Sequence, residues 1–298
     1  MPSKEEIMTF LKKSLRILPD KQYVALYYRL RIGKKLNWNN PKTLNEKLQW
    51  MKFNYRFPLQ SIVSDKLLVR DYVRDKIGEK YLIPLYGSWD SFEGIDFDAL
   101  PDKFVLKCNH DSGGLVVCQD KSKLNRKKAK KKIEKSLKAN FYVIGREYQY
   151  KNIIPKIICE QFISEDGTVP NDYKIYCFNG KPDVILVCRD RFSKNSHRAA
   201  YLFFDQNWKF LPLNKGDESV TNPDVPKPEN LDEMIEIARV LSQDFVFSRI
   251  DLYNIRGKIY FGEITLSPNS GFDPDITAET DAMFGKKLEI PYWDMIKK

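Results

Sequence analysis

Apolar residues recur every three or four positions in the first part of the chain, which is the pattern of amphipathic helices. The first predicted helix begins with Ser3 as N-cap, and Glu6 stands at the capping-box position. The last of these helices ends before Gly78, a residue typical of helix C-termini. We expect the apolar face of the first helix to pack on its own domain, with docking on a membrane as the alternative. The predicted helices are residues 3–18, 23–30, 44–53 and 64–76.

Beyond Pro84 the pattern changes to short apolar runs between polar, glycine-containing segments, which is typical of strands. A lysine-rich helix and a helix over residues 231–241 interrupt these runs. Helices followed by strand pairs predict an α+β fold, with a mostly helical region at 1–85, a small lobe at 86–160 and a C-terminal lobe at 161–298. The predicted strands are residues 104–107, 115–118, 157–163, 173–178, 184–188, 201–204, 246–253 and 258–266.

The net charge of the chain is concentrated in one segment. The 298 residues contain 50 Lys and Arg against 40 Asp and Glu, a formal charge of +10. Between Lys121 and Lys138, ten basic residues accompany one acidic residue, Glu134, so this segment alone contributes +9. Such a helix suits a nucleic acid, an anionic lipid surface or an acidic polymer. A helix that is merely solvated is the other interpretation.

Composition excludes several classes of protein. Aromatic residues at 13% argue against a disordered chain, and no apolar run approaches the roughly 18 residues of a membrane span. The first twenty residues carry Glu5 and Glu6 and do not form a secretory signal. Five cysteines without a C-x-x-C pair, and only His110 and His197, argue against a disulfide framework, a zinc site and a histidine-centred catalytic triad. We therefore expect a cytoplasmic protein.

The clearest chemical pattern lies in the last predicted hairpin. Because side chains two apart share a strand face, Arg249 and Asp251 point one way, and so do Glu263 and Thr265 on the partner strand. Folding the hairpin about Gly257 brings position 251 opposite position 263. Paired carboxylates repel unless a cation lies between them, and hard oxygen ligands favour Mg²⁺. A solvated face on which Arg249 neutralises both acids is the alternative.

Other charged residues stand at strand ends. Lys107 precedes the loop 109–114, whose glycines would let backbone N–H groups approach phosphate oxygens, although a plain hairpin loop is the favoured interpretation of this motif taken alone. The chain has no Walker A sequence. Asp172 and Lys174 share a strand face, and Glu160 and the Arg189–Arg191 segment also adjoin apolar runs. Surface salt bridges are the simpler interpretation of each set taken alone.

The order of these features resembles the ATP-grasp superfamily. The sequence presents, in turn, Lys66 in S-D-K, Lys107 before a glycine loop, Glu160 in C-E-Q-F-I, and then R-x-D and E-x-T in a hairpin. The stretch D-Y-K-I-Y-C-F-N-G-K-P followed by R-D-R is similar to a pattern of amino-acid-adding ligases in that superfamily. More narrowly, residues 20–290 resemble the TupA-like branch, which takes part in teichuronopeptide synthesis. The segments that carry this resemblance are P-K-T-L-N-E-K-L-Q-W, S-D-K-L-L-V-R-D-Y-V, V-L-K-C-N-H-D-S-G-G and G-E-I-T-L-S-P-N-S-G.

The resemblance implies an ATP-grasp fold in which two β-rich lobes enclose ATP. The phosphates would be held by Lys66 and Lys107 and by Ser112, Gly113 and Gly114 of the glycine loop. The adenine would bind at the strand end that contains Glu160, Gln161 and Ile163. Two charged residues, Asp172 and Lys174, would lie near the ribose and phosphates.

The resemblance also implies residues for the metal and the reaction. Asp251 and Glu263 would hold Mg²⁺ against the phosphates, and Arg249, with Arg189 or Arg191, would stabilise the oxyanion of a tetrahedral intermediate. One position departs from the family pattern.

Thr265 stands where the family has an asparagine ligand, so a second metal would be bound more loosely, through the hydroxyl or through Asn269.

The implied reaction joins a carboxylate and an amine. The carboxylate attacks the γ-phosphate of ATP to give an acyl phosphate, and the amine then displaces phosphate to form an amide. The TupA-like branch implies that one substrate is a uronic acid or an amino acid destined for a cell-surface polysaccharide. An anionic polysaccharide or lipid-linked sugar precursor would suit the Lys121–Lys138 helix, with peripheral contact at the inner face of the membrane and no specific nucleic acid.

Two other functions fit parts of the sequence. A glycosyltransferase using a nucleotide sugar would hold its metal with a D-x-D pair, and both Asp273-Pro274-Asp275 and Asp96-Phe97-Asp98 have that form. A non-catalytic protein that binds nucleic acid or a membrane would explain the basic segment. It would not explain the acids and lysines at strand ends.

Overall fold

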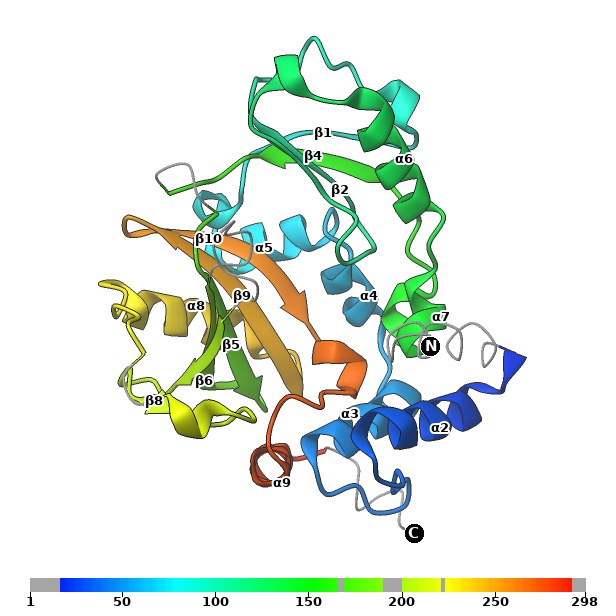
Figure 1. Ribbon diagram of the computed structural model, residues 1–298, viewed down its shortest axis with the longest axis vertical. Coiled ribbons are helices and arrows are strands. Elements are labelled where there is room, and N and C mark those ends of the chain that lie inside the picture. The colour runs from blue at the N-terminus through cyan, green and yellow to red at the C-terminus, as the bar shows by residue number, and fades with distance from the viewer. Residues whose placement is uncertain (1–16, 166–168, 190–199, 221–222, 291–298) are drawn as a thin grey trace.

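The computed structural model describes residues 17–165, 169–189, 200–220 and 223–290. Almost all of the first predicted helix therefore lies outside the described residues. The described chain forms two antiparallel sheets, one in each half of Figure 1, with helices packed around them. Among the described helices, none has both the length and the apolar character needed to cross a bilayer.

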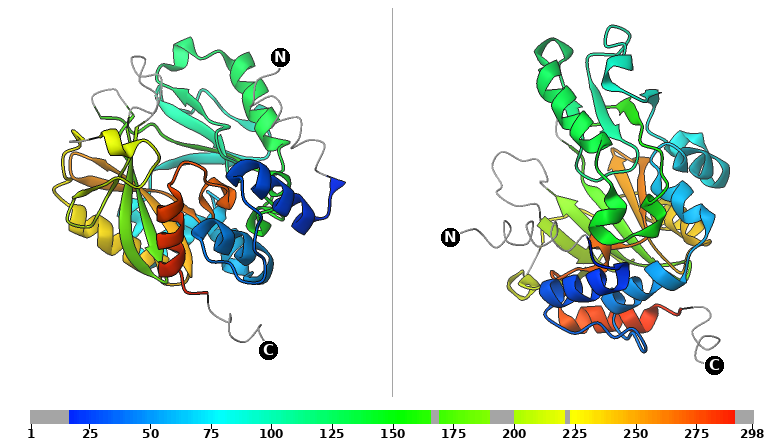
Figure 2. Two further views of the ribbon diagram at one scale, coloured as in Figure 1. Left: turned by 60° about the horizontal axis from the view of Figure 1, so that its bottom comes forward. Right: turned by 90° about the vertical axis from the view of Figure 1, so that its right-hand side faces the viewer.

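The smaller sheet has four strands in the order β1-β4-β2-β3. Helix α6 (Arg126–Leu137), which contains most of the basic segment, lies along one face of this sheet (Figure 2). Ala129 and Ile133 of α6 pack against Phe104 and Leu106 of β2 in a common apolar cluster. The strands are β1 (Leu85–Trp89), β2 (Phe104–Cys108), β3 (Val116–Cys118) and β4 (Ile157–Gln161).

The larger sheet has six strands in the order β10-β9-β5-β6-β7-β8. Helix α8 (Leu231–Ser242) joins β8 to β9 in the chain and packs on one face of the sheet. The strands are β5 (Asp172–Phe178), β6 (Lys181–Arg189), β7 (Ala200–Phe204), β8 (Phe210–Leu211), β9 (Phe247–Ile255) and β10 (Lys258–Thr265).

Alternation along β5 divides the two faces of this sheet. Odd positions such as Ile175 join the apolar cluster beneath α8, together with helix α5 (Val69–Ile77). On the other face, Tyr176 and Phe178 pack with helices α3 (Leu44–Asn54) and α9 (Ala278–Lys287). The remaining even positions on that face, Asp172 and Lys174, are charged and buried. Because strand side chains alternate, one strand builds an apolar core on one side and a polar site on the other.

Three of the described N-terminal helices, α3, the short α4 (Pro58–Ser64) and α5, pack on the larger sheet, whereas α2 (Asp20–Ile32) packs in a separate apolar cluster with Phe272. A capping box formed by Thr43 and Glu46 begins α3.

After α6, a five-residue helix, α7 (Phe141–Gly145), lies beside α2, where the carbonyl of Ile144 accepts a hydrogen bond from the hydroxyl of Tyr23 (Figure 1). The chain then enters β4 of the smaller sheet.

The predicted helix over residues 64–76 is confirmed from Val69 onward as α5, but its start is wrong, because a break at residues 65–68 separates α4 from α5. Asp65 causes the break: its Oδ1 accepts hydrogen bonds from the N–H groups of Leu67 and Leu68, at 2.8 and 3.2 Å. An aspartate that bonds its own neighbours in this way competes with helical hydrogen bonding. Lys66 consequently lies in a loop.

Candidate active site

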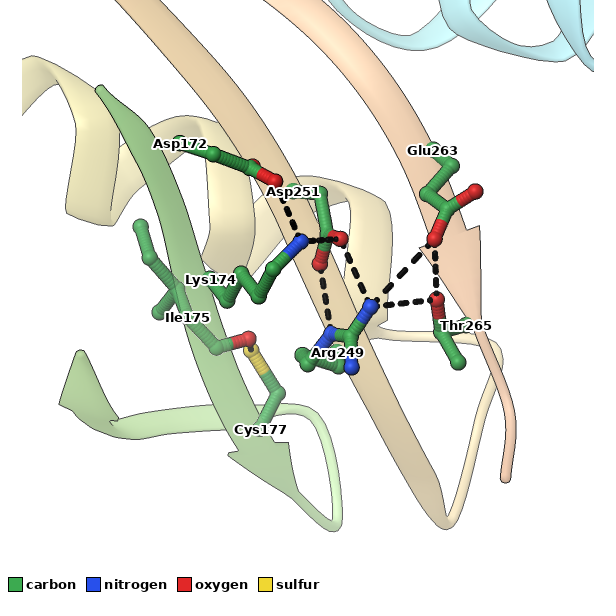
Figure 3. Close-up of polar contacts among 8 residues, drawn as sticks. All are labelled: Asp172, Lys174, Ile175, Cys177, Arg249, Asp251, Glu263 and Thr265. Atoms are coloured by element: carbon green, nitrogen blue, oxygen red, sulfur yellow. Dashed lines mark hydrogen bonds and ion pairs between the residues drawn. The ribbon is translucent and has the colours of Figure 1, made fainter. Parts of the chain in front are cut away.

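Charged side chains from β5, β9 and β10 meet on the face of the larger sheet opposite α8 (Figure 3). The strand register pairs Lys174 with Asp251, and Asp251 with Glu263. Lys174 forms ion pairs with Asp251 and with Asp172, the latter at 2.5 Å from Nζ to Oδ2. The hairpin prediction that Asp251 and Glu263 face one another on one side is therefore confirmed.

Arg249 connects the two carboxylates of the hairpin. Its Nε and Nη2 each donate to Asp251 at 2.7 Å, which is a bidentate contact. Nη2 also lies 3.3 Å from Oε1 of Glu263 and 3.1 Å from Oγ1 of Thr265. The Thr265 hydroxyl donates to the same Glu263 oxygen at 3.0 Å, so the four side chains form one network.

The charges of this network shift one another's pKa values. Burial acts to raise the pKa of Glu263, but Lys66, Arg249 and Lys174 together lower it to about 2. Burial raises the pKa of Asp251, and the two cations beside it oppose that rise. Three carboxylates lie beside Lys174 and Arg249, and Lys66 adds a third positive charge near Glu263, so the acidic and basic groups balance.

A cavity of about 140 Å³ lies between the two sheets and borders this cluster. Asp172 and Gly262 line it from the larger sheet, and Lys107 lines it from β2. The predicted adenine-binding residues Glu160, Gln161 and Ile163 also line it, and apolar contacts come from Ile83, Val105, Leu115, Val117, Phe162, Val169, Pro170, Cys188 and Tyr253. A concave, mainly apolar space with a few convergent charges is the usual form of a small-molecule site.

Two cations hold Glu160 in this cavity. Lys107 Nζ lies 2.5 Å from Oε2 of Glu160, and Arg70 Nη1 lies 3.3 Å from Oε1. Arg70 also donates to the carbonyl of Ile83 at 2.9 Å, which fixes its guanidinium. Sequence reasoning missed Arg70, because it lies on α5, ninety residues before its partner.

Lys66 approaches the same space from the loop between α4 and α5. Its Nζ donates to the carbonyl of Asp111 at 2.5 Å, and its N–H donates to that of Asn109 at 2.9 Å. Burial lowers the pKa of Lys66, and the carboxylate of Glu263 is the strongest influence that opposes this. Of the two lysines predicted to bind phosphate, Lys107 lines the cavity, whereas Lys66 does not line it and bonds the backbone of the glycine loop.

The glycine loop between β2 and β3 has two different parts. Ser112 and Gly113 are exposed, and Gly113 has a positive φ of 92°. Gly114 lies against α6, where an added Cβ would be 1.8 Å from Ser136 Oγ and 2.0 Å from Asp111 Oδ2. Only glycine fits there, so the base of the loop is fixed while its tip faces solvent.

The second predicted arginine does not join the cluster. Cys188 pairs with Asp172 and lines the cavity, so the next residue, Arg189, points to the opposite face of the sheet. Its guanidinium instead contacts the carbonyl of Asp224. Arg191 lies outside the described residues. Of the three predicted catalytic arginines, the structure places Arg249 in the cluster and Arg189 away from it.

Both D-x-D sequences form local turns. Oδ1 of Asp273 accepts from the N–H of Asp275 at 3.0 Å, and Oδ1 of Asp96 accepts from that of Asp98 at the same distance. An aspartate that bonds the backbone two residues on is an Asx-turn. The spacing of these aspartates therefore has a structural explanation.

Comparison with known families decides which fold this is. A model described as TupA-like ATP-grasp matches residues 46–289. The chain belongs to the TupA-like ATP-grasp family. As predicted, its α+β architecture of two antiparallel sheets is the ATP-grasp fold. The protein is accordingly an ATP-dependent carboxylate–amine ligase, an enzyme that uses ATP with Mg²⁺.

Solved ATP-grasp structures resemble this TupA-like chain at low sequence identity. D-alanine–D-alanine ligase from Bacillus anthracis complexed with ATP is 14% identical, with a TM-score of 0.49 over 100% of this chain and 92% of that one. L-amino acid ligase from Bacillus licheniformis is 14% identical, with a TM-score of 0.46 over 85% and 56%. The ADP complex of N5-carboxyaminoimidazole ribonucleotide synthetase is 14% identical, with a TM-score of 0.48 over 82% and 56%. No curated protein sequence matches the chain significantly.

The donors of this TupA-like protein fit Mg²⁺. Within the described residues, no cluster of three or more His, Cys, Asp and Glu could hold a metal ion without further ligands. Mg²⁺ is commonly bound by one or two carboxylates together with substrate phosphates, rather than by an all-protein cage. Asp251 and Glu263 supply two such carboxylates side by side. Glu263 has a side chain that is 42% exposed and is the more accessible of the two.

Proposed function

We propose that the cavity between the sheets binds ATP in one orientation. The adenine would contact the end of β4, where Glu160, Gln161 and Ile163 line the cavity. The phosphates would extend toward Lys66 and Lys107, beneath the loop that contains Ser112, Gly113 and Gly114. Asp172 and Lys174 would lie near the ribose and phosphates. This orientation places the phosphate end of ATP beside the cluster of Asp251 and Glu263.

The cluster supports phosphoryl transfer followed by amide formation. Asp251 and Glu263 would hold Mg²⁺, which neutralises phosphate charge when bound. Lys66 and Lys107 would add positive charge at the phosphates. A substrate carboxylate oxygen attacks the γ-phosphorus, releasing ADP and leaving an acyl phosphate. The amine then attacks the acyl carbon, loses a proton and expels phosphate, and the guanidinium of Arg249 would stabilise the intermediate oxyanion.

The single observation that supports this function best is the pairing of Asp251 with Glu263 around Arg249. The pair lies on strands that border the cavity, because Gly262 and Tyr253 of the same hairpin line it. We propose that the substrates are an amino acid and a uronic acid or sugar of a cell-surface polysaccharide. Thr265, engaged with Glu263 and Arg249, would supply a weaker second-metal ligand than an amide.

We further propose that the acceptor is an anionic polysaccharide or a lipid-linked sugar precursor. The outward side of α6 supports this, because Lys127, Lys131 and Lys135 are exposed and lie one turn apart. Reversing the charge of Lys127 and Lys131 should then raise KM for a polyuronate acceptor without changing ATP binding. An unchanged KM would remove this part of the proposal.

Titration calorimetry tests the nucleotide site directly. We expect wild-type protein to bind ATP only with Mg²⁺ and not to bind UDP-glucuronic acid. Glu263→Gln should weaken Mg²⁺-dependent ATP binding by about tenfold or more, since one charged ligand is lost. Glu279→Gln, an exposed acid on α9, is the matched control and should leave binding unchanged. UDP-sugar binding with no response to ATP would overturn the proposal.

Phosphate release with a panel of uronic and amino acids then identifies the substrates. A productive pair should give one ADP and one phosphate for each amide, with a product mass lower by one water than the sum of the substrates. Phosphate release without an amide product would instead indicate an ATPase.

A further inference from the structure

A second hollow lies outside the ATP cavity, between strand β3 and helix α6. It forms a groove of about 730 Å³ on the smaller sheet. Six consecutive residues, 115–120, line one side of it. If the groove bordered one face of β3, only every second residue of the strand would line it. A consecutive run indicates that the groove follows the backbone edge of β3.

Both faces of β3 are already in use. Leu115 and Val117 line the ATP cavity on one face, whereas Val116 and Cys118 join the apolar cluster under α6 on the other. On one edge, β3 pairs with β2. In the part of the chain that the structure describes, no strand pairs with the other edge, because β3 is last in the sheet order. That edge therefore presents backbone N–H and C=O groups to the groove.

Basic side chains of α6 line the opposite side of the groove. Lys128 and Lys132 lie one turn apart beside the buried Ala129, and all three residues line it. Among the described residues, neither lysine has an acidic partner within ion-pair distance. Lys123 also lines the groove, but it is paired with Asp120 at 2.9 Å. The groove thus combines an open strand edge with two cations that are not neutralised.

We propose that this groove binds an acidic peptide in an extended conformation, which adds a fifth strand beside β3. The backbone of the peptide would pair with the open edge of β3, as in other cases of strand addition. Lys128 and Lys132 are about 6 Å apart along the helix axis. Side chains on one face of an extended peptide recur about every 7 Å. Two acidic residues in alternate positions therefore match the two lysines in spacing and in charge.

The groove adjoins the active site but is separate from it. Leu115 and Val117 contact both hollows, so a peptide in the groove would lie across one strand from ATP. The edge of β3 distinguishes a peptide from other polyanions. A uronic acid polymer or a lipid surface can satisfy lysines, but neither carries the alternating amide groups that pair with a strand. This inference does not depend on the identity of the ligase substrates.

Fluorescence anisotropy with the intact protein and no nucleotide tests the proposal. The probe is a labelled ten-residue peptide of alternating Glu and Thr. Four competitors accompany it: the unlabelled parent peptide, the same peptide with alternate backbone nitrogens methylated, a ten-unit galacturonate oligomer, and phosphatidylglycerol vesicles. We expect the parent peptide to compete and the methylated peptide to be weaker by about tenfold or more, because methylation removes strand hydrogen bonds but keeps the charge.

Two double variants locate the binding surface. Lys128→Glu with Lys132→Glu should weaken peptide binding by about tenfold or more. Lys127→Glu with Lys131→Glu makes the same charge change on the outward side of the same helix and should change it by less than about threefold. Circular dichroism checks that both variants are folded.

Three outcomes would overturn the proposal. Equal losses in the two double variants would show that net charge alone attracts the peptide. If the methylated peptide bound as tightly as the parent peptide, the backbone edge of β3 would have no role in binding. Galacturonate or vesicles competing better than the peptide would assign the groove to a carbohydrate or a lipid surface.

Discussion

Asp251 lies opposite Glu263 because the last strand contains one extra residue. The hairpin pairs regularly from the pair Ile255–Lys258 to the pair Leu252–Phe261. The same register, if continued, would place Asp251 opposite Gly262. The register shifts between Phe261 and Glu263, which is a β-bulge. The bulge turns the carboxylate of Glu263 toward Arg249 and Asp251. The geometry of the proposed metal site therefore depends on a glycine that carries no functional group.

Replacing Gly262 by alanine should disturb this pairing. An added Cβ would lie 2.9 Å from the backbone oxygen of Asp251, which cannot move without shifting the strand. We expect Gly262→Ala to lower the free energy of unfolding by about 1–3 kcal/mol and to weaken Mg²⁺-dependent ATP binding. Urea denaturation and titration calorimetry measure the two effects.

Gly94→Ala is the matched control, because its new Cβ would meet nothing nearer than Trp89 Cδ1 at 3.5 Å. Wild-type ATP affinity in Gly262→Ala would contradict the role of the bulge.

The pairing of Asp251 with Glu263 could be predicted from the sequence, but its cause could not. Folding about Gly257 gives the right pair, whereas the actual turn consists of Arg256 and Gly257 together, since Ile255 pairs with Lys258. Both turn residues have positive φ, as in a two-residue hairpin. The bulge compensates for the difference of one residue. The local sequence signal for this bulge is a glycine, Gly262, inside a strand pattern.

Removing the cation between Asp172 and Asp251 should destabilise the protein strongly. Lys174 is buried between these two buried carboxylates. We expect Lys174→Met to cost about 3–5 kcal/mol at pH 8, because it leaves buried charge without its partner. The cost should shrink toward pH 4. Burial already raises the pKa of Asp251, and loss of the Lys174 cation raises the pKa of this carboxyl further above its unfolded value. Stability contributed by such a group is lost as pH rises.

Urea denaturation at both pH values measures this cost. Lys287→Met is the control, since it breaks a partly exposed pair with Asp183 and should cost less than about 1 kcal/mol. Similar losses in the two variants would contradict a central role for Lys174.

Arg70 should influence ATP binding although it lies on a helix far away in the sequence. Its guanidinium holds Glu160, which lines the proposed adenine site. We expect Arg70→Met to raise KM for ATP by about tenfold while kcat changes less, as lost positioning of a binding residue predicts. Steady-state kinetics over a range of ATP concentrations separates the two constants.

Arg74→Met provides the comparison, because Arg74 lies one turn further along α5 and pairs with the exposed Asp71 at 2.7 Å. A drop in kcat at unchanged KM in Arg70→Met would argue against a positioning role.

Contacts between distant segments account for most of what the sequence could not predict. Period-two alternation correctly assigns Asp172 and Lys174 to one face, because that pattern is local. Arg70 meets Glu160 only once the helical region has packed against both sheets, and no local pattern encodes such a contact. Arg189 has the right residue type in the right order, but alternation directs it to the other face. Order along the chain therefore predicts the family better than it predicts each side chain.

Lys52 should make stability rise with pH above neutrality. Its Nζ is buried and donates to Gln49 Oε1 at 2.9 Å and to the carbonyls of Gly145 and Ser270 at 2.7 and 2.5 Å. Burial lowers the pKa of Lys52 to about 7, although the negative charge of Glu147 acts to raise it. Between about pH 7 and its usual value of 10.5, the unfolded chain binds a proton at Lys52 that the folded protein does not. Folding is therefore favoured increasingly as pH rises through this range.

We expect the unfolding free energy of wild type, relative to Lys52→Met, to increase by up to about 1.4 kcal/mol per pH unit in this range. Urea denaturation of both proteins at pH 7.5, 8.5 and 9.5 measures it, and subtraction removes groups that titrate equally in both. Glu147→Gln should extend the increase below pH 7, because Glu147 is the charge that supports protonated Lys52. A constant difference between wild type and Lys52→Met across these pH values would mean that Lys52 stays protonated, held by its three acceptors.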